Sequence, residues 1–400
     1  MIAERMKHLV ANSSAIRAMF EEGNRLAGIY GAENVFDFSL GNPNVPAPKS
    51  VERAIKEILS EEPELEIHGY SKSNAGEEAV RKKVAQSLNK RFQTTFSSAN
   101  IVMTVGAAGG LNVIFKTLLN KGDEVIVFAP YFGEYRHYVS NFDGVLVEIS
   151  PNTADFQPKL EEFKEKITVK TKVVIVNTPN NPTGVIYKEE TIKELTSIME
   201  RKQKEYGTEI YLISDEPYRE LVYTKTQLPY LTKYYANTIV GYSFSKSLSL
   251  PGERIGYLVI PDEVADSGDV IQAAGVANRI LGFVNAPSLQ QKVAAKCIDE
   301  KTDISYYERN RNTLYEGLSE YGFSCIRPEG AFYLFMKSPV EEEKEFCKAA
   351  KKYNILIVPG SSFGCAGYVR LAYCVAYETI VNALPKFLEL AKEYGLGEGK

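Results

Sequence analysis

The feature that most constrains this chain is a series of short apolar runs separated by amphipathic stretches. Most of the runs are rich in Val and Ile without polar alternation, and they cover residues 101–105, 124–128, 172–177, 210–214, 238–243 and 255–260. Strands buried on both faces have this composition. Helical patterns lie between the runs, for example at 109–120 and 189–206. The sequence therefore predicts an α/β fold with a mostly parallel sheet flanked by helices.

The pattern changes after about residue 274. A long charged helical segment at 289–321 is followed by short alternating runs and one further helix; the runs are 323–327, 331–336, 355–358 and 368–371, and the helix is 344–353. A chain of 400 residues exceeds the size at which a single core stops growing. We therefore expect a large domain at 51–285 and a smaller α+β domain built from 1–50 and 286–400.

Charge and hydropathy exclude several kinds of partner. A net charge of −4 gives no reason to expect nucleic acid or an anionic membrane as a partner. No apolar stretch approaches the roughly 20 residues that a membrane-spanning helix needs. Residues 1–20 mix charges with apolar residues and lack the apolar core of a signal peptide. Small molecules are therefore the expected partners.

Cysteine and histidine usage narrows the chemistry further. The five cysteines form no CxxC pair, and only three histidines are present. An odd number of cysteines rules out a complete disulfide framework, and neither residue type has the spacing of metal ligands. We expect reduced thiols in a cytoplasmic protein that binds no metal.

Polar residues follow four of the apolar runs, where ligands bind in open α/β sheets. The segments are GAAGG at 106–110, TPNNPTG at 178–184, DEPY at 215–218 and FSKSLSLPGER at 244–254. Taken singly, each has a structural explanation: a glycine turn, a proline turn, a helix cap, a surface lysine. Together they supply a glycine-rich turn that can bind an anion, an amide side chain, a carboxylate with a phenol, and a lysine followed by an arginine.

The residue types in these four segments distinguish between a nicotinamide cofactor and pyridoxal phosphate. A nicotinamide site would need a G-x-G-x-x-G segment that opens a βαβ unit near the N-terminus, and none is present. Pyridoxal phosphate requires a lysine for a Schiff base, an anionic partner for its pyridine nitrogen and a phosphate site. The four segments contain residues of all three kinds.

On these motifs the sequence resembles the class I/II aminotransferases of pyridoxal-phosphate fold type I, the aspartate aminotransferase superfamily. The resemblance extends from FSLGNP at 38–43 to RLAY at 370–373. Its most specific part is SFSK at 243–246 with Arg254 eight residues after the lysine, preceded along the chain by NNPTG at 180–184 and DEPY at 215–218.

The resemblance implies a role for each cofactor-binding side chain. Lys246 would form the Schiff base with pyridoxal 5′-phosphate and then move the proton between the substrate α-carbon and the cofactor. Asp215 would pair with the protonated pyridine nitrogen. Tyr218 and Asn181 would donate hydrogen bonds to the 3′-oxygen of the cofactor.

The resemblance also implies a phosphate site shared between two subunits. Ser243, Arg254 and the backbone N–H groups around Ala107 and Ala108 would hold the phosphate. Tyr70 would reach the phosphate of a neighbouring subunit, so the resemblance implies a homodimer.

The remaining implied contacts concern the pyridine ring and the substrate. Phe132 lies where the family places a ring stacked on the pyridine. Arg370 would bind the α-carboxylate of the substrate, for which its planar fork is suited. Gly41 and Asn181 would lie beside the same carboxylate.

The expected reaction is a two-step transamination with aspartate as the first-choice donor and 2-oxoglutarate as an acceptor. A dicarboxylate needs a second cation; Ala108 stands where some relatives carry a basic side chain, which leaves Arg279 of a partner subunit as the candidate. Alanine and aromatic amino acids remain alternative donors.

Two other functions use the same fold. A C–S β-lyase or an aminocyclopropane-carboxylate synthase would share the cofactor residues, because these enzymes differ in how a common carbanion is used. A transcription regulator would need a basic helix-turn-helix domain, and the roughly 35 residues before Phe38 are too few for one at typical domain sizes.

Overall fold

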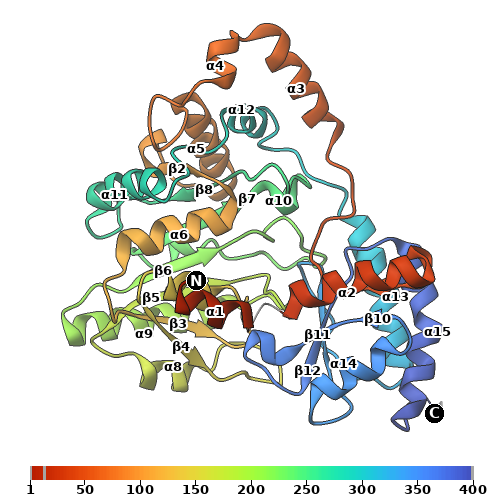
Figure 1. Cartoon of the computed structure of the whole chain (residues 1–400). Coiled ribbons are helices and arrows are strands. Elements are labelled where there is room, and N and C mark those ends of the chain that lie inside the picture. The colour runs from red at the N-terminus through yellow and green to blue at the C-terminus, as the bar shows by residue number, and fades with distance from the viewer. Residues whose placement is uncertain (1, 12–14, 398–400) are drawn as a thin grey trace.

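The computed structural model describes residues 2–11 and 15–397 (Figure 1). Its largest element is a seven-stranded sheet with the strand order β2-β8-β7-β6-β5-β3-β4. The strands are β2 (Ile101–Thr104), β3 (Glu124–Phe128), β4 (Val145–Ile149), β5 (Thr171–Asn177), β6 (Tyr211–Asp215), β7 (Thr238–Ser243) and β8 (Gly256–Val259). Only the pairs that β8 makes with β2 and β7 are antiparallel. The predicted α/β class with a mostly parallel sheet is confirmed.

The six strands predicted from apolar runs all lie in this sheet, whereas β4 was not predicted. It is an edge strand, paired only with β3. Of its five residues only Ile149 is buried. Its sequence, VLVEI, has an apolar run of only three residues before Glu148, so the longer run that reveals the central strands is absent here.

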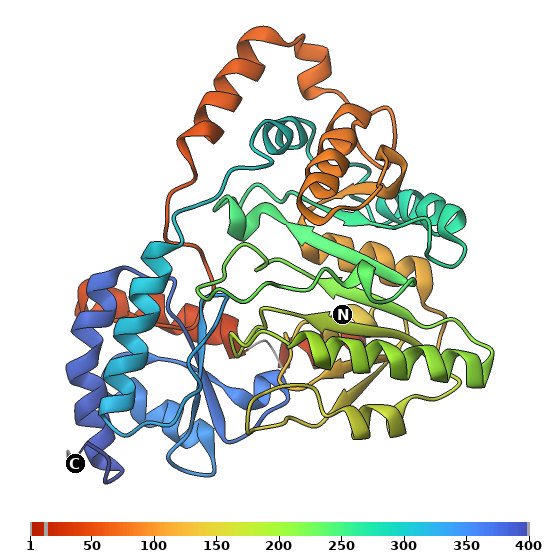
Figure 2. The ribbon, with the colours of Figure 1, turned by 180° about the vertical axis from the view of Figure 1, so that it is seen from behind.

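Helices cover both faces of this sheet (Figures 1 and 2). On one face α6 (Gly106–Leu118), α7 (Tyr135–Ser140) and α11 (Ser267–Ile280) pack against it. On the other lie α8 (Leu160–Lys166) and α9 (Glu189–Tyr206). A further layer packs near the β2 edge, made of α3 (Lys49–Glu61), α4 (Glu64–His68), α5 (Glu78–Phe92) and α12 (Ser288–Lys296).

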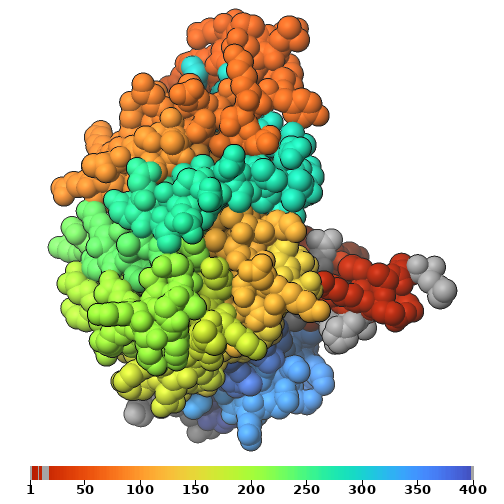
Figure 3. Space-filling model, turned by 90° about the vertical axis from the view of Figure 1, so that its left-hand side faces the viewer, coloured from red at the N-terminus to blue at the C-terminus, as the bar shows by residue number. Residues whose placement is uncertain are grey.

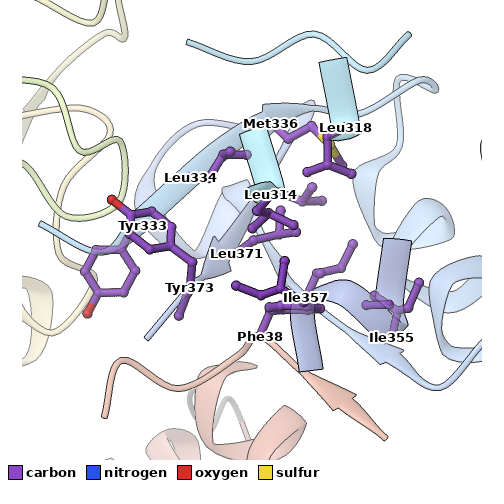
Figure 4. Packing of buried hydrophobic residues seen from close by; sticks show 14 of the residues in the cluster. Phe38, Leu314, Leu318, Tyr333, Leu334, Met336, Ile355, Ile357, Leu371 and Tyr373 are labelled. Carbon is purple, nitrogen blue, oxygen red and sulfur yellow. The ribbon is translucent and has the colours of Figure 1, made fainter. Parts of the chain in front are cut away.

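A smaller group of strands and helices forms from the two ends of the described chain. The strands β9 (Tyr333–Lys337), β11 (Val358–Pro359) and β12 (Tyr368–Ala372) are antiparallel, and β1 (Phe36–Asp37) pairs with β10 (Ile355–Leu356). The helices are α2 (Ala15–Tyr30), α13 (Ser305–Glu320), α14 (Glu343–Lys351) and α15 (Tyr377–Glu393). Figure 4 shows their shared core, in which Phe38 meets Leu314 and Leu371.

The alternating runs predicted for this part formed strands with one exception. The run at 323–327 contributes only an isolated bridge between Cys325 and Met336. The predicted division into domains at 51–285, and at 1–50 with 286–400, stays a proposal.

The N-terminal helix α1 (Glu4–Ala11) projects from the surface in Figure 3. It is tied to α7 by Arg5, whose guanidinium donates to the backbone oxygen of Ser140 at 2.5 Å. Within the residues described, every helix is too short or too polar to cross a lipid bilayer.

Two features of this fold bring polar residues to one place. The parallel register sets Asn177, the last residue of β5, beside Asp215, the last residue of β6. Directly after β7, the short helix α10 (Phe244–Ser247) begins, and the Ser243 hydroxyl caps it by accepting from the Ser245 N–H at 3.1 Å. The strand ends and the α10 turn therefore share one edge of the sheet.

Candidate active site

The carboxyl ends of β5, β6 and β7 open onto a cavity of about 250 Å³. Eleven of the twelve predicted cofactor-binding and substrate-binding residues line it: Gly41, Ala107, Ala108, Phe132, Asn181, Asp215, Tyr218, Ser243, Lys246, Arg254 and Arg370. Tyr70 is the exception. The structure therefore brings together side chains that are separated by more than three hundred positions in the chain.

Lys246 extends from α10 into this cavity. Its ammonium group donates to the backbone oxygen of Gly41 at 2.7 Å, and its Nζ lies 5.3 Å from the centre of the Phe332 ring. Burial, with smaller contributions from Arg254 and Arg370 and a small opposing one from Cys374, lowers the pKa of Lys246 to about 8. The neutral amine that a nucleophile must be is therefore a minority form near pH 7, but a far larger one than for an ordinary lysine.

Asp215 is a buried carboxyl group with one unused oxygen. Its Oδ2 accepts from the Tyr135 hydroxyl at 2.5 Å, whereas its Oδ1 is buried without a hydrogen-bond partner. Burial raises the pKa of Asp215 to about 7, with Glu216 adding to this and the Tyr135 bond opposing it. An unpaired buried carboxylate is costly, so this group is suited to receive a cationic ligand atom.

This burial predicts a pH-dependent stability of the ligand-free protein. The pKa of an unfolded Asp is about 3.9, and the pKa of folded Asp215 is about 7. As the pH rises between these values the unfolded chain loses its proton first. The group should therefore lower the free energy of unfolding across this window, by up to about 4 kcal/mol.

Urea unfolding of the ligand-free wild type and the Asp215→Asn variant would measure this effect. The variant cannot ionise, so its stability relative to the wild type should increase from about pH 4.5 to about pH 7.5. A difference between the two proteins that stays constant over this range would contradict the expectation.

Arg370 lies in the middle of β12 and is buried. Its guanidinium donates to the backbone oxygen of Ser39 at 2.5 Å and to Oδ1 of Asn181 at 3.2 Å. A further donor, Nε, is buried without a partner. Burial lowers the pKa of Arg370, although a guanidinium stays charged in proteins. A buried cation with a free donor is an anchor for a carboxylate.

A second cationic region lies at the start of α6. Gly106 has φ +75, and a Cβ atom there would lie 2.8 Å from Nη2 of Arg254. The arginine donates to the backbone oxygens of Val105 at 3.3 Å and Pro251 at 3.0 Å. The free N–H groups at the start of this 13-residue helix and the guanidinium together favour a phosphate.

Aromatic rings form part of the cavity wall. Phe132 is half-buried and packs edge-on against Tyr135, with ring centres 5.5 Å apart. Tyr218, which is buried, has its hydroxyl oxygen 2.9 Å from that of Tyr333. A flat ring could therefore lie against Phe132 with a phenol near its edge.

Several residues of the site were missed in the sequence. Tyr138, Asn177, Ser245 and Tyr333 line the cavity, and Tyr135 bonds Asp215. Asn177 ends a predicted strand, so the rule that found Asp215 could have found it too.

Tyr70 and Arg279 lie outside this cavity in the single chain. Tyr70 is 85% exposed and shares a surface hollow with Phe283 and residues 285–288. Arg279 is exposed near the end of α11. The roles predicted for both require a second subunit, so they stay predictions.

Comparisons with known proteins agree with the geometry. The family model described as aminotransferase class I and II matches residues 33–387. An aspartate aminotransferase of Thermotoga maritima is 31% identical over 88% of this chain and 90% of its own length.

Solved structures are similar over nearly the whole chain. A crystal structure of an aminotransferase from Eubacterium rectale has a TM-score of 0.95 at 45% identity, covering 98% of this chain and 99% of the other. An aspartate aminotransferase from Thermus thermophilus, solved with maleate, has a TM-score of 0.85 at 26% identity, with coverage of 98% and 99%.

Proposed function

The chain belongs to the class I and II aminotransferases, and on this premise we propose that it transfers the amino group of L-aspartate to a 2-oxo acid, with 2-oxoglutarate as the acceptor. The observation that carries the proposal is the convergence of Lys246, Asp215 and Arg370 on one cavity. These three side chains offer a partly neutral amine, a carboxyl group with an unused oxygen and a cation with an unused donor.

The family uses pyridoxal 5′-phosphate, and the residues present fit this group. The unpartnered Oδ1 of Asp215 is suited to the pyridine nitrogen, and Lys246 is suited to the aldehyde. The start of α6 with Ser243 and Arg254 provides donors for the phosphate. When bound, the cofactor supplies an electron sink for negative charge at the substrate α-carbon.

The protein side chains would then orient the substrate and move one proton. Arg370 would hold the α-carboxylate through its guanidinium, beside Asn181, to which it is already bonded. In its neutral form the Nζ of Lys246 would accept a proton from the substrate α-carbon and deliver it to the carbon of the cofactor that the amino group joins. The ionised form of Asp215 would keep a positive charge on the pyridine nitrogen. Tyr218 and Asn181 would face the 3′-oxygen.

Aspartate is supported by the names of the relatives and by maleate, a dicarboxylate, in the Thermus structure. The second carboxylate needs a cation. Among the described residues that line the cavity, the cations are Lys246, Arg254 and Arg370, and each already has a proposed partner. Arg279 of a second copy of this chain is therefore the proposed ligand of the distal carboxylate.

Replacement of Arg279 by alanine should lower kcat/KM for aspartate by about 10- to 100-fold, which is the loss expected for one charge-assisted contact. The kcat/KM for alanine, which lacks the distal carboxylate, should change less than about twofold. Steady-state assays with both donors measure this, and Arg201→Ala, which removes an exposed arginine on α9, is the control. Equal losses with both donors would remove Arg279 from the specificity site.

The absorption spectrum of the cofactor-loaded enzyme tests the reaction itself. Excess L-aspartate without an oxo acid should convert the aldehyde form of the cofactor stoichiometrically into the amine form, and 2-oxoglutarate should restore it. If aspartate has no effect, alanine and aromatic amino acids are the next donors to test. Continuous release of pyruvate and sulfide from cysteine, without the amine form accumulating, would instead identify a C–S β-lyase.

We also propose that the protein is a cytoplasmic homodimer with shared active sites. Tyr70 and Leu65 are 85% and 89% exposed, so both side chains are available to contact a second subunit. All five cysteines are free thiols. Sedimentation at micromolar concentration would test the dimer, and Tyr70→Phe should weaken phosphate binding in it.

A further inference from the structure

Tyr333 lines the cavity although none of the sequence motifs includes it. It is the first residue of β9 and is only 3% exposed. Its hydroxyl oxygen lies 2.9 Å from that of Tyr218, and the two rings meet edge-on at 5.6 Å and 82°. Figure 4 shows Tyr333 in the core of the smaller group of strands and helices, next to Tyr373. A buried phenol therefore links that core to the cavity.

The Tyr333 ring also supports the buried guanidinium. The centre of the Arg370 guanidinium lies 4.6 Å from the centre of this ring. A cation over an aromatic face is stabilised, more so when it is desolvated. Gly41 also packs closely against Tyr333, because a Cβ atom at Gly41 would lie 2.0 Å from the Tyr333 hydroxyl oxygen. Tyr333 thus contacts the parts of the site proposed for the cofactor and for the substrate.

Counting donors and acceptors indicates which of the two hydroxyl groups donates the hydrogen bond between Tyr333 and Tyr218. Each phenol carries one proton and accepts through its oxygen. Burial raises the pKa of Tyr333 to about 12 and that of Tyr218 well above its ordinary value, so both remain protonated donors. If Tyr218 donates into the cavity, its oxygen must accept the proton of Tyr333. Without Tyr333, the Tyr218 hydroxyl loses the hydrogen-bond partner that it has in the structure.

We propose that Tyr333 is a positioning residue for the transamination proposed above. Its hydroxyl donates to the Tyr218 oxygen and so directs the Tyr218 proton into the cavity, while its ring supports the Arg370 guanidinium. This inference rests on the proposed function. A hydrogen-bond donor that itself accepts a bond is polarised and donates more strongly. Tyr333 therefore strengthens the bond from Tyr218 to the 3′-oxygen of a bound cofactor.

A stronger donor at the 3′-oxygen stabilises the deprotonated cofactor–lysine group and lowers the pH at which its absorption changes. The other titratable or charged groups that interact with the two phenols are Asp215 from β6, Arg370 from β12 and Cys374 after β12, and Lys246 from α10 lines the same cavity. They remain in place when only the Tyr333 oxygen is removed, so a change in the midpoint reports on that oxygen.

The test uses the cofactor-loaded full-length enzyme and the Tyr333→Phe variant. The midpoint of the pH-dependent absorption change should rise by about 0.5 to 1 pH unit, as expected for loss of one bond in a polarised chain. The kcat should fall about 3- to 10-fold, while KM changes less than about twofold because the ring below Arg370 remains. In Tyr333→Leu, which lacks the ring, KM for the amino acid should also rise, by about 10-fold.

Two further variants make the test specific. Tyr373→Phe removes a buried phenol that donates to the Ala331 oxygen at 3.3 Å in the same core but outside the cavity, and its midpoint should equal that of the wild type. In the double variant Tyr218→Phe/Tyr333→Phe, the midpoint should equal that of Tyr218→Phe alone, because Tyr333 acts through Tyr218.

Two results would overturn the inference. An unchanged midpoint in Tyr333→Phe, or shifts that simply add in the double variant, would mean that Tyr333 does not act through Tyr218. If either result is found while the wild-type enzyme transaminates normally, the proposed function still holds and only the role of Tyr333 is refuted. A wild type that neither takes up pyridoxal 5′-phosphate nor changes its absorption with any amino acid would overturn both.

Discussion

Replacement of Lys246 by alanine is expected to lower kcat for transamination by on the order of 10⁴-fold, because this one side chain is proposed to supply both the amine for the cofactor and the proton-transferring base. Lys246 is the only lysine among the described residues that line the cavity. No neighbouring amine can therefore replace it. Stopped-flow absorption and steady-state assays on the cofactor-loaded variant would measure the loss.

The control for this variant is Lys193→Ala, which removes an exposed lysine of α9 that pairs with Glu189. Its kcat should match the wild type. Borohydride reduction followed by peptide mapping should place the cofactor on Lys246 in the wild type. A Lys246→Ala enzyme with more than about a tenth of wild-type turnover would refute the assignment, because loss of a general base alone costs about 10²- to 10⁴-fold.

Replacement of Asp215 by asparagine should have the second largest effect, a loss of roughly 10²- to 10³-fold in kcat, comparable to breaking a buried ion pair. Asparagine keeps the shape of the side chain and an oxygen that can accept from Tyr135, which now bonds Oδ2. It removes only the negative charge that would hold the pyridine nitrogen in its protonated form. The effect therefore isolates the electrostatic contribution.

Steady-state kinetics and the dissociation constant of the cofactor should both change in this variant. Asp269→Asn, at an exposed position of α11, is the matched control and should leave both unchanged. Near-normal kcat in Asp215→Asn would show that the charge of Asp215 is not needed for the reaction.

Much of the site could be predicted from sequence because it lies at strand ends. The runs that end at Asp215 and Ser243 are buried on both faces, so their apolar composition reveals the strands. Once the strands are located, the polar residues that follow must share one edge of the sheet. Local sequence therefore determines this part of the site.

The remaining residues depend on packing between distant segments. Tyr135 and Tyr138 belong to the short helix α7, and Tyr333 begins a strand of another sheet. Tyr138 and Tyr333 reach the cavity, and Tyr135 reaches Asp215, only because these elements pack against the main sheet, and no local pattern encodes that. Tyr70 is exposed in the single chain, and the role proposed for it needs a second chain, which no pattern within one chain can place.

The contact between Ser39 and Arg370 has a consequence for biosynthesis. These residues bond across 331 positions, so the ribosome must complete nearly the whole chain before the arginine can reach the segment made at the start. The residues of helix α6 and Lys246 leave the ribosome earlier. Synthesis adds about 5 to 20 residues per second, and domains fold while it proceeds. A nascent chain therefore acquires the elements proposed to bind phosphate several seconds before it acquires the arginine proposed to bind the substrate carboxylate.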